Sequence, residues 1–299
     1  MFLKSLLYLK KDIVIGLGEI GTPIYKLFSK SFTVEVYDIN PKLIDKNLKK
    51  NELLPVRFLH ICIPYTKNFN SQILKLEKKF HPQGIVIHST IKPSTTSNIQ
   101  RKLQIPVIYS ATRGVHKRML KDLRRYTKFF AIENNAPNKK WACTEFVRLL
   151  KKSGLKTKQM SSPITLELGK IVCDTSYYGW LINFAQISKI IADKEKVDYD
   201  EMWSFSNEIH KFLGNRPKMF PGFIGGHCVI PNLELLNDNS LNQIKQINNL
   251  FKNKKINMIS GKSGCGKTTI VDLIIGLYKS NSGQILINNT PLNKINIYY

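Results

Sequence analysis

The sequence has few cysteines and lacks any long apolar run. Five cysteines are scattered through 299 residues, none forms a CxxC pair, and no cysteine–histidine cluster has zinc-site spacing. Such an odd, scattered set indicates a reducing compartment. No apolar stretch approaches the roughly 18 residues that a membrane helix needs. The start, MFLKSLLYLKKD, is interrupted by Lys4 and has no cleavage site, so it is a poor signal peptide. We expect a cytoplasmic protein without a metal site or a transmembrane segment.

Acidic residues and arginine are also scarce. The chain has 46 Lys and Arg against 21 Asp and Glu, a formal charge of +25. Such an excess can indicate a surface for nucleic acid or anionic membranes. Only 8 of the basic residues are arginine, the side chain expected where bases are read or phosphates are clamped. We favour a compositional origin of the charge, expect no nucleic-acid partner, and interpret the basic stretch 113–128 as a solvated helix face.

Short apolar strands alternate with helical patterns over the first 110 residues. The expected strands are 12–18, 32–38, 57–65, 84–90 and 106–111, with helices between them. This order predicts an α/β fold, a Rossmann-type doubly wound parallel sheet with helices on both faces. The later residues are helical, with an amphipathic helix at 141–154 and one long pattern from 164 to about 194. We expect that long helix to join domains or to form a dimer interface.

The segment GLGEIG is a G-x-G-x-x-G loop that follows a strand and opens a helix. Gly16, Gly18 and Gly21 permit a tight turn and a close approach of pyrophosphate, and the helix N-terminus adds amide donors. Ile20 completes the predicted cofactor loop. Asp38 ends the next strand, where it would accept hydrogen bonds from ribose hydroxyls and repel a 2′-phosphate, which favours NAD over NADP. The alternative is a glycine-rich turn that binds nothing.

The most specific feature outside the glycine loops is PGFIGGHCVIP at 221–231. With GLGEIG, YDINP, CIPY and HSTIKPSTT, this segment resembles the UDP-glucose/GDP-mannose dehydrogenase family, whose motifs occur in the same order. The resemblance covers about residues 10–236. It implies an NAD-dependent oxidation of a nucleotide-sugar alcohol through a cysteine thiohemiacetal, and a homodimer formed through the central helix.

The resemblance also implies roles for single residues. Cys228 matches the nucleophile, Lys170 in ELGK matches the lysine that stabilises the alkoxide, and Thr90 matches a threonine beside the reacting centre. The family has Asn four residues after the lysine and Asp four residues after the cysteine. Here those positions are Asp174 and Asn232. A carboxylate and an amide can share one site with their roles exchanged, so both remain catalytic candidates.

Two further departures from the family bear on turnover. Its S-P-E segment, whose glutamate serves the thioester half of the reaction, reads Ser110-Ala111-Thr112 here. Its C-terminal domain, which holds the nucleotide of the substrate, would begin just after the cysteine loop, where this chain has a different segment. Both departures predict impaired catalysis, unless the substrate is a smaller one.

That later segment contains a P-loop, GKSGCGKT, after a strand and before an apolar helix. Lys267 would reach the terminal phosphates of ATP, and Thr268 would ligate magnesium. The predicted ATP- and phosphate-binding residues are Gly261, Gly264, Gly266, Lys267, Thr268 and Thr269. The segment resembles the start of an ABC-transporter ATPase subunit, but only 31 residues follow Thr268. Because the other hydrolytic motifs are absent, we expect no ATPase activity, with weak ATP binding or a poorly folded remnant as alternatives.

The sequence therefore predicts four parts. They are a Rossmann domain at 1–140, a helical central domain with the cysteine loop at 141–236, a linker at 237–249 and a truncated P-loop fragment at 250–299. Three functions remain open: an NAD-dependent dehydrogenase, an incomplete P-loop module, and a non-catalytic fusion that only binds NAD.

Overall fold

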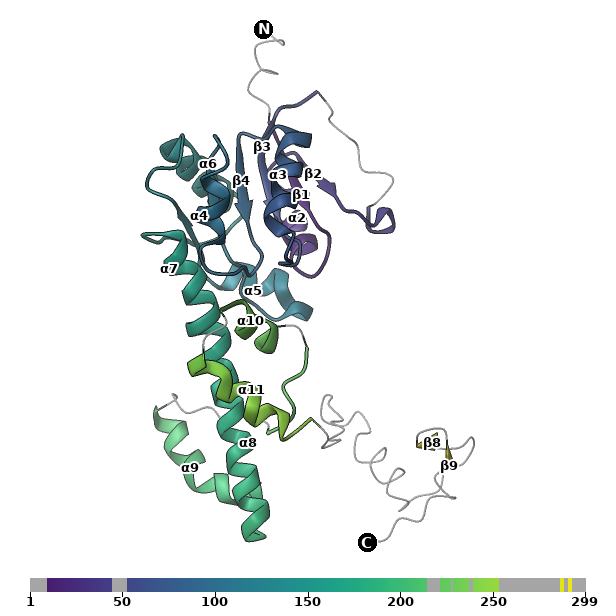
Figure 1. Ribbon diagram of the computed structural model, residues 1–299, viewed down its shortest axis with the longest axis vertical. Helices are drawn as coiled ribbons and strands as arrows, with labels where there is room; N and C mark the ends of the chain where they lie inside the picture. The colour runs from purple at the N-terminus through teal and green to yellow at the C-terminus, as the bar shows by residue number, and fades with distance from the viewer. Residues whose placement is uncertain are drawn as a thin grey trace. The chain divides into compact units, whose positions relative to one another are not determined.

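The computed structural model describes residues 10–44, 53–213, 221–226, 228–236, 239–252, 286–287 and 290–291 (Figure 1). The chain divides into two compact units, Met1–Phe251 and Lys252–Tyr299. The described part of the second unit is a short antiparallel pair of strands, β8 (Leu286–Ile287) and β9 (Thr290–Pro291). The predicted P-loop residues 261–269 lie outside the described residues.

The first unit is built on a seven-stranded sheet with the order β2-β1-β3-β4-β5-β6-β7. Its strands are β1 Lys11–Ile15, β2 Val34–Tyr37, β3 Val56–Ile61, β4 Gly84–Ile87, β5 Val107–Tyr109, β6 Lys128–Ile132 and β7 Thr157–Gln159. All neighbouring strands are parallel except β5 and β6, which are antiparallel. The predicted doubly wound α/β fold is confirmed. The antiparallel strand β6 was not predicted from the sequence.

Helices cover both faces of this sheet. They are α2 Gly21–Phe28, α3 Phe69–Phe80, α4 Thr95–Gln100, α5 Met119–Arg125 and α6 Lys139–Lys152. On one face α2, α5 and α6 enclose a core with Val14, Phe58, Val86 and Ile108 of the central strands. On the other face α3 and α4 cover the alternate strand residues. Burial on both faces explains why the central strands are mostly apolar, and the polar residues that they contain, such as Asp12, Arg57 and His60, are buried as well.

Residues 163–195 form one continuous helical column that leads away from the sheet (Figure 1). It consists of α7 (Pro163–Leu168), a π-helical stretch labelled η3 (Gly169–Ser176) and α8 (Tyr177–Glu195), followed by α9 (Tyr199–Leu213). The predicted long helix is therefore present, with a change of winding near its start. Proline at the first turn and the Ser162 side chain, which accepts from Thr165 N, account for where α7 begins.

The end of the first unit folds back on this column. The helices α10 (Val229–Leu236) and α11 (Asn242–Asn249) pack against η3 and α8 through an apolar cluster that includes Val229, Leu233 and Ile244. The described part of the segment that we expected to be a linker is thus helical, because Ile244 and Asn248 are buried against α8. The domain boundaries themselves stay a prediction.

Candidate active site

The first glycine loop is tight at two of its glycines and open at the third. Gly16 has φ +91°, and a Cβ on Gly21 would lie 1.7 Å from the carbonyl oxygen of Gly16. By contrast, a Cβ on Gly18 would meet nothing within 4 Å. The loop therefore needs Gly16 and Gly21 for its own turn, and it leaves an open approach at Gly18.

The loop lies where a ligand site is expected in such a sheet. It follows β1, and the chain runs to β2 on one side of that strand and to β3 on the other, which makes this the topological switch point. Asp38 accepts hydrogen bonds from Leu17 N at 2.7 Å and from Asn40 N at 2.8 Å. Each carboxylate oxygen keeps a free lone pair, so hydroxyl donors can still bind there. Helix α2 begins at Gly21 without a side-chain cap, and Thr22 N donates to Gly18 O at 3.1 Å. The N-terminal end of this helix would favour a phosphate through the helix dipole. These features fit a dinucleotide, and that this dinucleotide is NAD stays a prediction.

Cys228 lies at the start of α10, where its carbonyl accepts from Asn232 N at 3.3 Å. Its side chain is exposed, and Sγ lies 3.9 Å from Nε2 of His116. Nδ1 of that histidine lies 2.7 Å from Oε2 of Glu19 in the glycine loop. The cysteine loop and the glycine loop thus meet through His116. The sequence did not predict a role for His116 or Glu19, because the two residues lie far apart in the chain and share no motif.

The electrostatics of Cys228 work against a free thiolate. Burial raises the pKa of the Cys228 thiol above its ordinary value. The Lys170 cation lowers this pKa, while the carboxylates of Glu19 and Asp174 raise it further. The net direction is upward, so the thiol form dominates at neutral pH unless a base takes the proton.

Lys170 and Asp174 both lie on the π-helical stretch and form an ion pair of 2.6 Å. Thr175 Oγ1 donates to Lys170 O at 3.0 Å, and Ser176 Oγ donates to Ile171 O at 2.8 Å. The side-chain hydroxyls thus donate hydrogen bonds to backbone carbonyls of the π-helical stretch. π-turns of this kind occur often at functional sites, because they redirect side chains within a helix.

Asn232 is brought to the same stretch by α10. Its Nδ2 donates to Thr175 Oγ1 at 3.3 Å, next to Asp174 in the chain. The two residues that depart from the family pattern are therefore neighbours across the η3–α10 contact, but each has its own partner. Thr90 lies half-buried in the loop after β4, and among the described residues it makes no hydrogen bond to Cys228 or Lys170.

Glu167 fixes the helix that carries Lys170. Its buried carboxylate accepts from Ser94 N at 2.6 Å, Thr96 N at 3.0 Å and Thr96 Oγ1 at 2.6 Å. Burial raises the pKa of Glu167, and these hydrogen bonds partly oppose that rise. The carboxylate caps the start of α4, so the HSTIKPSTT and ELGK segments hold each other. The hydrogen bonds of Glu167 thus connect the two motifs in space. This connection was not predicted from the sequence.

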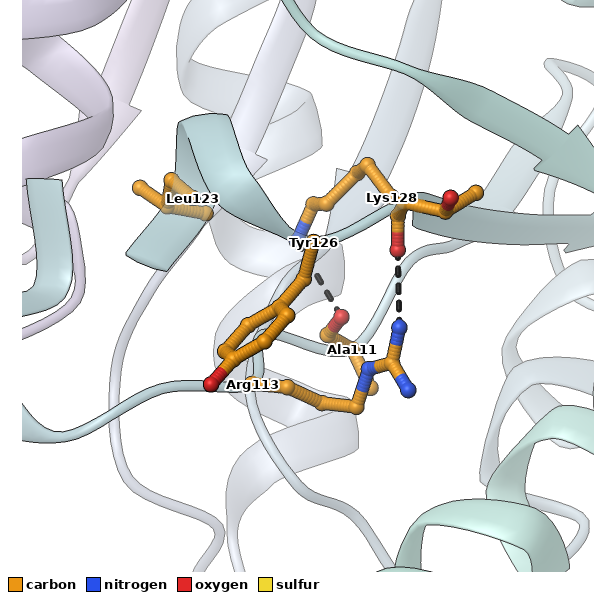
Figure 2. Close-up of a pocket in the computed structure, with 6 residues that line it drawn as sticks. Ala111, Arg113, Leu123, Tyr126 and Lys128 are labelled. Carbon is orange, nitrogen blue, oxygen red and sulfur yellow. Dashed lines mark hydrogen bonds between the residues drawn. The ribbon is translucent and has the colours of Figure 1, made fainter. Parts of the chain in front are cut away.

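The segment Ser110-Ala111-Thr112, which stands where the resembled family has S-P-E, is hydrogen-bonded to a buried lysine (Figure 2). Lys128 is buried, and its Nζ donates to Ser110 O at 2.8 Å, Ala111 O at 3.2 Å and Thr112 Oγ1 at 2.9 Å. Burial lowers the pKa of Lys128 to about 7. The adjoining cavity of about 10 Å³, which Figure 2 shows, has room for about one water molecule. Thr112 is thus tied into the fold, and no carboxylate replaces the glutamate there.

The exposure of most basic side chains in 113–128 agrees with the interpretation of this stretch as a solvated helix face. The exposed cations are Lys117, Arg118, Lys121, Arg124 and Arg125. Lys128 and Arg113 are exceptions, because Lys128 is buried and the half-buried Arg113 donates to Thr127 O at 2.8 Å. Within the described ranges no helix is long and apolar enough to cross a membrane, and no three His, Cys, Asp or Glu side chains are grouped so that they could hold a metal ion.

Several solved structures share the fold of this chain. The UDP-D-ManNAc dehydrogenase of Pyrococcus horikoshii has a TM-score of 0.67 at 19% identity, with 81% of this chain and 68% of that chain covered. The UDP-N-acetyl-mannosamine dehydrogenase of Staphylococcus aureus has a TM-score of 0.61 at 19% identity, with coverage of 92% and 72%. The 3-hydroxyisobutyrate dehydrogenase of Mycobacterium tuberculosis has a TM-score of 0.57 at 11% identity, with coverage of 81% and 92%.

Residues 244–298 match the family model described as ABC transporter. An export ATP-binding/permease protein of Rickettsia typhi is 39% identical over 66 residues, which are 22% of this chain and 10% of that protein. The sulfate/thiosulfate import ATP-binding protein of Mannheimia succiniciproducens is 38% identical over 56 residues, 19% of this chain and 16% of that protein. The chain thus spans a small part of these relatives, and the match begins inside α11. The protein therefore has a Rossmann-like fold that it shares with solved nucleotide-sugar dehydrogenases, and its C-terminal segment matches the ABC transporter family model.

Proposed function

We propose that the first unit is an NAD-dependent oxidoreductase that oxidises a sugar alcohol of a nucleotide sugar through Cys228. One observation carries this proposal: the exposed thiol of Cys228 reaches the glycine loop through His116 and Glu19. A nucleophile beside a dinucleotide loop is what a dehydrogenase with a covalent intermediate requires. The fold of the solved nucleotide-sugar dehydrogenases supports the same substrate class.

The glycine loop supplies the residues that would hold NAD. Gly18 leaves the approach open, Gly16 and Gly21 shape the turn, and Ile20 stands at the start of α2. Asp38 offers carboxylate lone pairs to ribose hydroxyls and would repel a 2′-phosphate. NAD, when bound, accepts a hydride from the carbon that is oxidised.

The chain's own residues perform the remaining chemistry. The Cys228 thiolate attacks the aldehyde carbon, and the carbonyl electron pair moves to oxygen as the thiohemiacetal forms. The Lys170 ammonium offsets the negative charge on that oxygen, and Asp174 holds the ammonium in place. Asn232 and Thr90 are proposed to orient the substrate, as hydrogen-bonding groups on α10 and after β4.

The thiohemiacetal carbon must then lose a second hydride, which a second NAD would accept, to give a thioester. Water must finally cleave this thioester, and that step lacks the family's glutamate. Thr112 occupies that position and accepts a hydrogen bond from Lys128. We therefore propose that hydrolysis is slow in this protein and that overall turnover is impaired. The chain covers 68% of the length of the Pyrococcus enzyme.

The test is NADH formation measured by absorbance with a panel of UDP- and GDP-sugars. The parent chain should form NADH, and Cys228→Ala should abolish this activity. Cys173→Ala is the matched control, because Cys173 is also exposed and lies on η3, and it should leave the rate unchanged. A parent rate equal to that of Cys228→Ala with every sugar would contradict the proposal.

A second candidate function rests on the ABC transporter match at 244–298. In this alternative the segment with GKSGCGKT binds ATP and magnesium without hydrolysis, and the first unit only binds NAD. Phosphate-binding loops of this sequence are specific for nucleotides. Binding of a fluorescent ATP analogue that Lys267→Ala removes, together with no NADH formation, would favour it over the dehydrogenase.

We also propose a homodimer through the central helix column, in a cytoplasmic setting. The described part of α8 carries exposed Tyr177, Phe184 and Ile191, which is a large apolar area for a helix facing water. Size-exclusion chromatography with light scattering should give twice the chain mass. Phe184→Glu should give the monomer.

A further inference from the structure

Three segments that are distant in sequence place side chains in one line beside the proposed nucleophile. Glu19 comes from the glycine loop, His116 from the short 3-10 turn η2 (His116–Arg118), and Cys228 from the start of α10. Oε2 of the glutamate lies 2.7 Å from Nδ1 of the histidine, and Nε2 lies 3.9 Å from Sγ of the cysteine. The two ring nitrogens thus face different groups, a carboxylate and a thiol.

This order of groups determines which proton the histidine can move. A carboxylate at Nδ1 favours the tautomer that carries its proton there. Nε2 is then the acceptor, and it faces the thiol. An acceptor within hydrogen-bonding reach of a sulfur nucleophile, and itself oriented by a carboxylate, is the arrangement that activates thiols and hydroxyls in other enzymes.

The other charged groups around the thiol do not replace such a base. Lys170 stabilises a thiolate but cannot accept its proton while charged, and Asp174 is paired with Lys170 at 2.6 Å. Glu19 faces His116. His116 is therefore the group placed to take the proton from Cys228 within the described site.

We propose that His116 is a catalytic base that deprotonates Cys228, and that Glu19 is the positioning residue that orients its ring. The Sγ–H bond breaks, its electron pair stays on sulfur, and the proton forms a bond with Nε2. When the thioester is later cleaved, the imidazolium returns this proton to the departing sulfur. The role in turnover rests on the proposed dehydrogenase function, whereas the proton transfer itself is a property of the free protein.

The experiment measures alkylation of Cys228 by iodoacetamide in the full chain, followed by peptide mass spectrometry across the pH range in which imidazole and thiol groups titrate. In the parent the alkylation rate should rise at a lower pH than in a variant without the base. In His116→Asn the rise should move to higher pH, and the rate at neutral pH should fall about tenfold or more. Glu19→Gln should shift the profile in the same direction by a smaller amount.

Two controls separate this effect from a general change of structure. Alkylation of the exposed Cys173 in the same sample should be equal in all variants. Lys117→Gln removes one exposed cation next to His116 and should leave the Cys228 profile unchanged. If His116→Asn alters the Cys173 rate as well, His116→Gln is used to repeat the comparison.

The failure of this inference differs from the failure of the proposed function. A parent that forms NADH through Cys228, with a Cys228 alkylation profile that both His116 variants leave unchanged, would overturn the base and keep the dehydrogenase. A shifted profile in a protein that forms no NADH with any sugar would support the base and reject the dehydrogenase.

Discussion

The two glycine loops of this protein differ in what surrounds them. GLGEIG follows the first strand of a seven-stranded sheet, with a helix, an acidic residue and a cysteine loop arranged around it. GKSGCGKT is the more specific motif, and its segment matches a family model over residues 244–298, but the match reaches only 10% to 16% of the curated relatives. A phosphate-binding motif acts through the groups around it, so the larger context supports our proposal that the first loop carries the function.

The largest expected effect separates the two loops by activity. Cys228→Ala should lower NADH formation by at least about 10³-fold, because the covalent step needs the thiolate. Lys267→Ala, which removes the lysine expected to reach the terminal phosphates in the second loop, should leave NADH formation unchanged. Initial rates measured side by side by absorbance decide this. Comparable losses in both variants would mean that the two loops act together.

The next effect concerns stability within the first loop. Gly21→Ala should lower the free energy of unfolding by about 3 kcal/mol or more, because the new Cβ would lie 1.7 Å from Gly16 O. Gly18→Ala is the matched control and should cost less than about 1 kcal/mol, because its Cβ meets nothing within 4 Å. Urea unfolding measures both. Equal costs would show that the loop does not have this geometry.

A third prediction uses the buried ionisable groups of the sheet that carries the first loop. Asp12 and Arg57 form a buried ion pair of 2.6 Å, and His60 Nδ1 lies 3.0 Å from His88 Nε2. Burial, followed by the nearby Lys128 and His60, holds the pKa of His88 well below its ordinary value. His88 is therefore neutral in the folded state.

The unfolded chain binds more protons than the folded one below the ordinary histidine pKa, so stability falls as the pH is lowered through that range. The loss should be about 1.4 kcal/mol per pH unit below about pH 6.5. Urea unfolding at a series of pH values measures this slope, and His88→Asn should reduce it. A parent slope near zero in that range would contradict the neutral buried histidine.

The smallest effect concerns the choice of cofactor at the first loop. Asp38→Asn keeps the side-chain shape and one acceptor but removes the negative charge beside the loop. The preference for NAD over NADP should fall by about tenfold, because repulsion of the 2′-phosphate is lost. Fluorescence titration with both cofactors measures this. An unchanged ratio would show that Asp38 does not face the ribose.

Much of the first unit could be predicted from sequence, and particular residues show where prediction stopped. The apolar runs that became β1, β3 and β4 were recognisable because strands buried on both faces contain few polar residues. The antiparallel direction of β6 could not be predicted, because the periodicity of a strand does not show in which direction it runs relative to its neighbour. The helix at 163–195 was predicted, but its π-helical winding depends on bonds such as that of Thr175 to Lys170 O.

The sequence predicted the motifs of the candidate site but not how their side chains lie relative to one another. Cys228 and Lys170 stood out because their segments resemble a family. The structure links Cys228 to the glycine loop through His116, and the Lys170 cation lowers the pKa of Cys228. The pairing of His116 with Glu19 could not be predicted, since nothing in the sequence links a basic stretch to a glycine loop. Glu167 is similar, because its capping of α4 depends on how α7 meets the sheet.

The central claim is that the first glycine loop, rather than the second, carries the function. Calorimetric titration of the full chain with NAD and with ATP in separate experiments tests it most directly. We predict binding of NAD that Asp38→Ala weakens, and weak or undetectable binding of ATP. Tight binding of ATP that Lys267→Ala removes, with no binding of NAD, would contradict the account.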